Sequence, residues 1–101
     1  MNEKDEVIIM TEQVRVRQMH LKTAEATPWH FHSQVVDNIY CLQGSLEVQL
    51  HAPDLQIPLA VGQRCEILTG RLHRVVNVGQ VQATYLLVQG IGEYDFNISS
   101  I

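Results

Sequence analysis

The stretch HFHSQVVDNIYCLQG, residues 30–44, points most directly to the fold of this chain. His30 and His32 are two positions apart, so on a β-strand both imidazoles lie on the same face. Asp37 adds a carboxylate five residues after His32, and Gly44 provides a turn seven residues later. Two imidazoles and a carboxylate that converge can ligate one metal ion. This stretch therefore predicts two strands of a β-protein that carry part of a metal site.

A second stretch, GQRCEILTGRLHRVVN at residues 62–77, contains a third histidine, His73, between Gly70 and Asn77. An imidazole from this distant strand could complete the ligand set that the first stretch begins. Mixed imidazole and carboxylate ligands suit one divalent transition metal such as Fe, Mn, Ni, Zn or Cu, and they leave a coordination position for water or substrate. The predicted metal ligands are four side chains, those of His30, His32, Asp37 and His73.

The rest of the sequence surrounds these stretches with further strand signals. No stretch keeps apolar side chains at helical spacing without an interrupting Gly or Pro. Short apolar or alternating runs recur instead at spacings of about 8–12 residues, which is typical of an all-β sandwich or barrel. Nine such runs are predicted strands, at residues 7–10, 14–21, 27–32, 38–42, 46–50, 55–59, 64–68, 73–78 and 81–89. The alternating tail, residues 93–101, is a candidate edge strand.

Length and charge restrict the class of protein. A chain of 101 residues predicts a single domain over residues 1–101. The formal net charge of −4 and the lack of a Lys/Arg block argue against nucleic-acid binding. No run of about 20 apolar residues could span a membrane, and residues 1–6 lack the order of a signal peptide, so we expect a cytoplasmic protein. Cys41 and Cys65 are expected to be reduced, buried thiols.

The two stretches resemble the two motifs of the cupin superfamily. The first motif is a Gly, five residues, His-x-His, three or four residues, Glu, six residues and a Gly. The second is a Gly, five residues, Pro-x-Gly, two residues, His, three residues and Asn. Residues 24–44 and 62–77 match these spacings, and the short gap between them looks like that of small bacterial single-domain cupins. Three positions depart from the pattern, because Ala24 replaces Gly, Asp37 replaces Glu and Leu68 replaces Pro.

The resemblance implies a cupin jelly roll, which is a double-stranded β-helix. It also implies that the three histidines hold the metal, while two roles stay open for Asp37. Its side chain is one methylene, or about 1.5 Å, shorter than that of Glu. It either ligates the metal directly or accepts a hydrogen bond from a ligand imidazole or a bound water. For Asn77 the motif position implies hydrogen bonds that hold a turn or a strand end.

This fold leaves the function open. One hypothesis is a metal-dependent enzyme, such as a dioxygenase or lyase acting on a small organic acid. The alternative is a non-catalytic sensor or accessory module that binds a small ligand or a metal. Catalytic residues are not assigned, since Tyr40 and Glu66 are candidates only by residue type. Arg64, Arg71 and Arg74 form either a solvated rim or a site for an anionic substrate.

Because side chains alternate along a strand, each residue next to a predicted ligand can be assigned to one face of its strand. Trp29 and Phe31 should face away from the metal and pack between sheets or in a dimer interface. Ile39 and Cys41 share the face of Asp37, so they either line the pocket or belong to the core.

A homodimer is expected because the open edges of a small jelly roll need covering. The apolar run 7–10 and the alternating tail near Phe96 are the candidate covers or contacts. Small cupins resemble one another in pairing this way.

Overall fold

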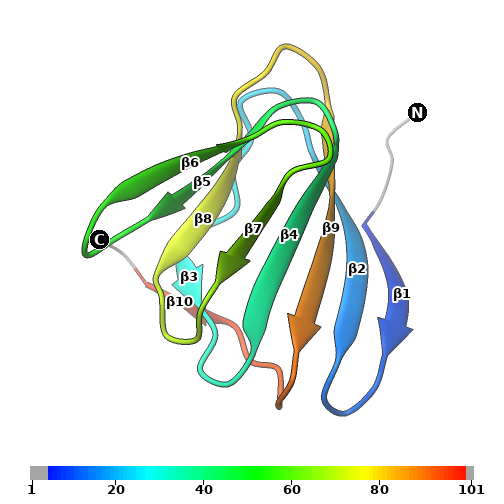
Figure 1. Cartoon of the computed structure of the whole chain (residues 1–101), viewed down its shortest axis with the longest axis vertical. Coiled ribbons are helices and arrows are strands. Elements are labelled where there is room, and N and C mark those ends of the chain that lie inside the picture. Colours follow the sequence, from blue (N-terminus) through cyan, green and yellow to red (C-terminus); the bar gives the residue numbers. More distant parts are fainter. Residues whose placement is uncertain (1–4, 100–101) are drawn as a thin grey trace.

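The computed structural model describes residues 5–99 and contains ten β-strands in that range, with no helix (Figure 1). The all-β prediction is therefore confirmed. The strands are β1 (Glu6–Met10), β2 (Arg15–Leu21), β3 (His30–Phe31), β4 (Val36–Gln43), β5 (Leu46–Leu50), β6 (Leu55–Leu59), β7 (Arg64–Ile67), β8 (His73–Asn77), β9 (Ala83–Gly90) and β10 (Asn97–Ile98). Between residues 5 and 99, no helix offers the length and apolar character needed to cross a membrane.

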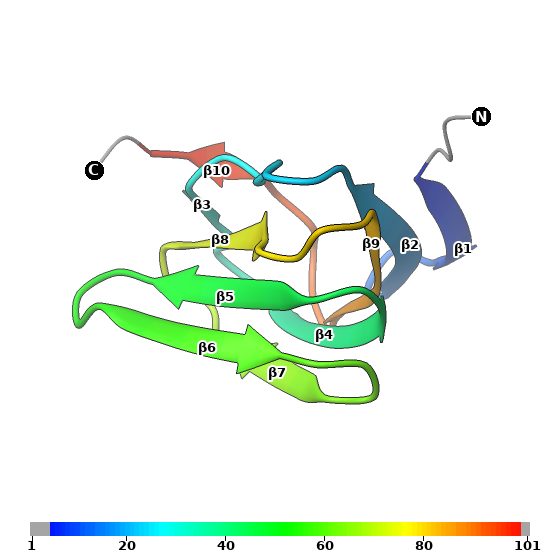
Figure 2. The ribbon, with the colours of Figure 1, turned by 90° about the horizontal axis from the view of Figure 1, so that it is seen from above.

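The strands form two five-stranded antiparallel sheets, and Figure 2 shows them facing each other around a common interior. One sheet has the order β1-β2-β9-β4-β7 and the other has the order β10-β3-β8-β5-β6. The register of the strands places polar residues side by side within each sheet. Asp37 on β4 lies opposite Gln89 on β9, and His30 on β3 lies opposite His73 on β8.

The core follows from the alternation of side chains along each strand. In β4, β8 and β9 every second residue points inward and is buried, as the period of two requires. The inward residues near one end of these three strands are Asp37, His73 and Gln89, whereas those farther along are mainly apolar. Burying each larger aliphatic side chain contributes about 1.5–3 kcal/mol to stability. The inward apolar side chains therefore hold the two sheets together, and the inward polar side chains at the other end of the strands are available to form a site.

Two turns confirm the motif spacing. Gly44 has a φ of +80°, and a Cβ there would lie 3.1 Å from the Cα of Ala83, so this turn requires glycine. Ala24 has a φ of +65° and stands where the cupin motif carries glycine. An L-residue in this left-handed conformation costs roughly 1–2 kcal/mol. Ala24 therefore differs from the motif glycine in its side chain, but it keeps a backbone conformation that is typical of glycine.

Some strand limits differ from the prediction. Of the strand predicted at residues 27–32, only His30–Phe31 forms a strand, β3. Pro28 has no N–H to donate, which interrupts the ladder before His30. The predicted tail strand is confirmed in part as β10, which pairs with β3 and covers its edge, while residues 100–101 lie outside the described range.

Candidate metal centre

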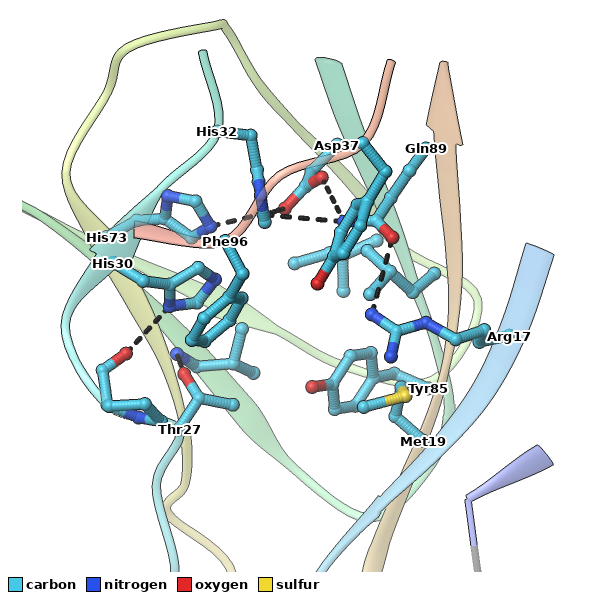
Figure 3. Close-up of a pocket in the computed structure, with 15 residues that line it drawn as sticks. Arg17, Met19, Thr27, His30, His32, Asp37, His73, Tyr85, Gln89 and Phe96 are labelled. Atoms are coloured by element: carbon cyan, nitrogen blue, oxygen red, sulfur yellow. Dashed lines mark hydrogen bonds and ion pairs between the residues drawn. The ribbon is translucent and has the colours of Figure 1, made fainter. Parts of the chain in front are cut away.

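The four predicted ligands come from both sheets and meet in the interior (Figure 3). His30 lies on β3 and His32 follows that strand, while His73 lies on the paired strand β8. Asp37 reaches the cluster from β4 of the facing sheet. All four side chains are buried, and each offers one ligand atom within 4.8 Å of all the others. The structure thus brings together all four predicted ligands.

Each imidazole is oriented by a backbone carbonyl on its outer side. The Nδ1 atoms of His30, His32 and His73 lie 2.7, 2.6 and 2.7 Å from the carbonyl oxygens of Pro28, Asp95 and Arg71, respectively. A carbonyl oxygen can only accept a hydrogen bond, so each Nδ1 must carry the proton. In the neutral ring, each Nε2 then presents its lone pair to the interior. This is the arrangement by which outer hydrogen bonds orient metal-ligating histidines.

Acceptor atoms converge at the centre of the cluster. The Oδ2 atom of Asp37 lies 3.2 Å from the Nε2 atoms of both His32 and His73. Two neutral imidazole lone pairs and a carboxylate oxygen repel one another at this distance unless a positive charge lies among them. A divalent metal ion or protons on the imidazoles would supply that charge. The donor set therefore fits a transition metal, and the shorter side chain of Asp37 does reach the imidazoles.

The surroundings of the site keep the Asp37 carboxylate ionised, and they shift the pKa values of His30 and His32 in opposite directions. Burial raises the pKa of Asp37, but hydrogen bonds from His32 and His73, when these rings also carry a proton on Nε2, and from the amide of Gln89 outweigh it and hold this pKa well below its usual range. Burial lowers the pKa of His30 to about 4, so this ring is neutral at pH 7. Burial also lowers the pKa of His32, but the Asp37 carboxylate outweighs that effect and the net shift is upward. The first two shifts favour the ionisation states that metal ligation needs.

A pocket of about 190 Å³ adjoins the four ligands. A concave space of this kind beside the four ligands suits a small-molecule ligand. The walls are largely apolar, with a few polar groups among them. Beside the four ligands, the pocket is lined by Arg17, Met19, Thr27, Pro28, Ile39, Val75, Tyr85, Leu87, Gln89, Tyr94 and Phe96.

A family model described as a cupin domain matches residues 17–89, which is most of the chain. The chain belongs to the cupin family. The jelly-roll prediction is thereby confirmed together with the two facing sheets. No curated protein matches this cupin at a significant level.

Solved structures share the fold of this cupin. A conserved Klebsiella pneumoniae protein with a double-stranded β-helix domain aligns over 94% of this chain and 77% of its own, with 19% identity and a TM-score of 0.83. An oxalate oxidase aligns over 85% of this chain and 46% of its own, with 16% identity and a TM-score of 0.79. A Silicibacter pomeroyi sugar phosphate isomerase aligns over 86% and 68%, with 16% identity and a TM-score of 0.69. This cupin thus spans about half of the oxalate oxidase, and identities this low show the fold alone.

Several other predicted positions are placed by the structure. Asn77 holds a strand end as expected, since its amide donates to the carbonyls of Leu21 and Val81 and its Oδ1 accepts from the N–H of Gly79. Trp29 lies outside the pocket beneath the guanidinium of Arg74.

The three arginines considered for an anionic substrate do not line the pocket. Arg64 donates to the side chain of Asn38, Arg71 donates to backbone carbonyls of residues 52–53, and Arg74 donates to Gln49. They belong to the rim and surface, which was one of the two expected roles. Tyr40 and Glu66 also lie outside the pocket lining.

Sequence reasoning missed most of the polar groups and the aromatic wall around the ligands. Arg17 shares a face with Met19 on β2, and this alternation was visible in the sequence, but the direction of the face was not. Gln89 donates to Asp37 Oδ1 at 2.9 Å, a contact that depends on the pairing of β4 with β9. Phe96 stacks on His30 with ring centroids 4.4 Å apart, so the tail forms part of the site and is not only an edge cover.

Proposed function

We propose that this cupin binds one divalent transition metal through His30, His32, His73 and Asp37 and is a metal-dependent enzyme acting on a small organic acid. A dioxygenase or a lyase is the reaction class that we favour. The observation that carries the proposal is the convergence of three carbonyl-oriented imidazoles and one carboxylate beside a pocket for a small molecule.

The residues of the chain have separate tasks in this proposal. A divalent ion held there would act as a Lewis acid towards a substrate oxygen or as an activator of dioxygen. Gln89 holds Asp37 in place through its hydrogen bond to Oδ1. Phe96 packs against His30 and the backbone carbonyl of Asp95 accepts from His32, so the C-terminal segment orients two ligands. The apolar side chains keep bulk water from the reacting atoms.

Two proteins that share the fold are named for small-molecule substrates. One is an oxalate oxidase, whose name refers to a small acid, and another is a sugar phosphate isomerase. The pocket of about 190 Å³ beside the four ligands has room for a small organic acid, which is the substrate class that we propose.

Protein loaded with Fe(II) is expected to consume O₂, or to release a cleaved product without O₂, with at least one member of a panel of small acids and catechols. The variant His73→Ala, treated in the same way, should give no turnover because it lacks a ligand. An oxygen electrode and mass spectrometry of the products make the measurement. Tight binding of a panel member that is returned unchanged would contradict the enzyme proposal and favour the sensor or accessory module.

We also propose that the chain forms a homodimer through β1. This strand ends its sheet, and four apolar side chains on it are exposed by 48% to 64%: Val7, Ile8, Ile9 and Met10. An open edge with exposed apolar side chains is a template for pairing with another strand.

Light scattering at micromolar concentration is expected to give the mass of a dimer, and Ile9→Lys should shift it to that of a monomer. The control Val61→Lys places the same charge on an exposed apolar residue in a turn and should leave the dimer intact. A wild-type monomer would contradict this part of the proposal.

A further inference from the structure

Among the described residues 5–99, Arg17 is the one arginine that lines the pocket. It lies on β2 and points into the pocket from the side opposite His30 and His73 (Figure 3). Met19 shares its face of the strand and lies opposite Tyr85 on β9, whereas Arg17 lies opposite Leu87. The guanidinium is thus set between Tyr85 and Gln89 on the inner surface of the sheet.

The charge of Arg17 has no counter-charge within residues 5–99. No carboxylate in that range lies within ion-pairing distance of its guanidinium. Its Nη2 donates to Gln89 Oε1 at 3.3 Å, and its buried Nε has no acceptor in this part of the chain. A guanidinium has five N–H donors in a planar fork that matches a carboxylate. The Tyr94 ring, whose centroid lies 5.7 Å from the guanidinium carbon, supplies no negative charge, so this cation facing an apolar pocket favours an anionic ligand.

A single amide group separates Arg17 from the metal cluster. Gln89 donates to Asp37 Oδ1 at 2.9 Å through its Nε2 and accepts from Arg17 through its Oε1. A ligand of only a few carbons can therefore reach both the guanidinium and the four metal ligands.

Tyr85 supplies a second polar group that points into the same space. Its side chain is 2% exposed, and its hydroxyl group is directed into the pocket (Figure 3). No acceptor or donor within residues 5–99 pairs with this hydroxyl. This hydroxyl faces the pocket without a protein partner in that range, so it is available to hydrogen-bond an oxygen atom of a ligand.

We propose that the ligand is a short acid with oxygen atoms at both ends: one carboxylate is held by Arg17, and a second oxygen-bearing group meets the His/Asp cluster. The Tyr85 hydroxyl donates to an oxygen atom of one of these two groups. This inference rests on the proposed metal centre and narrows its substrate to dicarboxylates and their close analogues. Arg17 is then the residue that determines specificity.

Calorimetric titration of the metal-loaded protein tests this inference with matched probes. Malonate, succinate and glutarate are compared with propionate, butyrate and valerate, which have the same chain lengths but a methyl group in place of one carboxylate. The best dicarboxylate should bind roughly ten- to a hundredfold more tightly than its partner, because a hydrogen bond to a charged group is worth that much. In Arg17→Gln the preference should fall below threefold, and Arg17→Lys should restore part of it.

Arg15→Gln is the matched control. It removes the same charge two residues away on the same strand, but Arg15 lies over the Tyr94 ring and does not line the pocket. It should keep the dicarboxylate preference. Equal binding of the two probe series by the wild type, or an unchanged preference in Arg17→Gln, would overturn the inference. Inorganic phosphate binding more tightly than every dicarboxylate, and depending on Arg17, would overturn the assignment to a carboxylate.

The metal content of the same samples separates this inference from the proposed function. A metal-loaded wild type without any dicarboxylate preference would contradict the role of Arg17 and leave the metal centre intact. A wild type that takes up no metal would contradict the proposed function. The same probes on metal-free wild type and Arg17→Gln would then still decide the role of Arg17, since the contact with the guanidinium requires no ion.

Discussion

The variant His73→Ala is expected to lose metal binding almost completely, with a fall in affinity of more than roughly 100-fold. Loss of a residue that only orients a ligand typically lowers metal affinity 10–100-fold, whereas loss of a ligand leaves a coordination position empty. His73 is 2% exposed and its Nε2 lies 3.2 Å from Asp37 Oδ2, so its removal leaves a gap within the buried cluster. Competition titrations with a metal-sensitive dye measure the change.

His51→Ala provides the matched control for this prediction. His51 pairs with Asp54 at 2.8 Å near the surface and lies outside the pocket that adjoins the cluster. Its removal should leave the metal affinity within threefold of the wild type. Wild-type affinity in His73→Ala would show that β8 supplies no ligand and that the site is misassigned.

Asp37→Ala is expected to weaken metal binding by roughly 10–100-fold, and by less than His30→Ala or His32→Ala. The carboxylate already accepts a hydrogen bond from the amide of Gln89 at 2.9 Å, so the protein itself stabilises part of its charge. Asp37→Asn keeps the volume of the side chain and removes its charge, so a similar loss in both variants would assign the effect to charge. Metal titrations of the four variants give the order directly.

Asp37→Glu restores the residue that the cupin motif carries. We expect metal binding to be unchanged or slightly tighter, with a cost of about 1–3 kcal/mol in the free energy of unfolding because an extra methylene must fit a buried position. If Asp37→Ala loses the ion as completely as the histidine variants, the carboxylate is a full ligand. If it loses nothing, the carboxylate has no part in binding the metal.

The ligand cluster could be predicted from the sequence because it depends on two local rules. The period of two places His30 and His32 on one face of a strand, and glycine at a turn such as Gly44 marks where the next strand begins. The motif spacing then adds His73 from the distant strand. These rules hold without knowledge of which strands pair.

The remainder of the pocket could not be predicted because it depends on strand pairing and on irregular backbone. Gln89 meets Asp37 only through the register between β4 and β9, which no local pattern specifies. Arg17 looked like any charged residue of an alternating strand, and its inward direction follows from the packing of β2 in the sheet. Phe96 reaches His30 through a segment with little regular structure before β10.

The proposed function requires that four side chains hold one divalent metal ion. Elemental analysis of the protein, both as purified without added metal and after titration with Fe, Mn, Ni, Zn and Cu salts, tests it most directly. We predict close to one transition-metal ion per chain, bound by the wild type and lost in His73→Ala. A wild-type protein that takes up no transition metal, even with excess salt, would contradict the account.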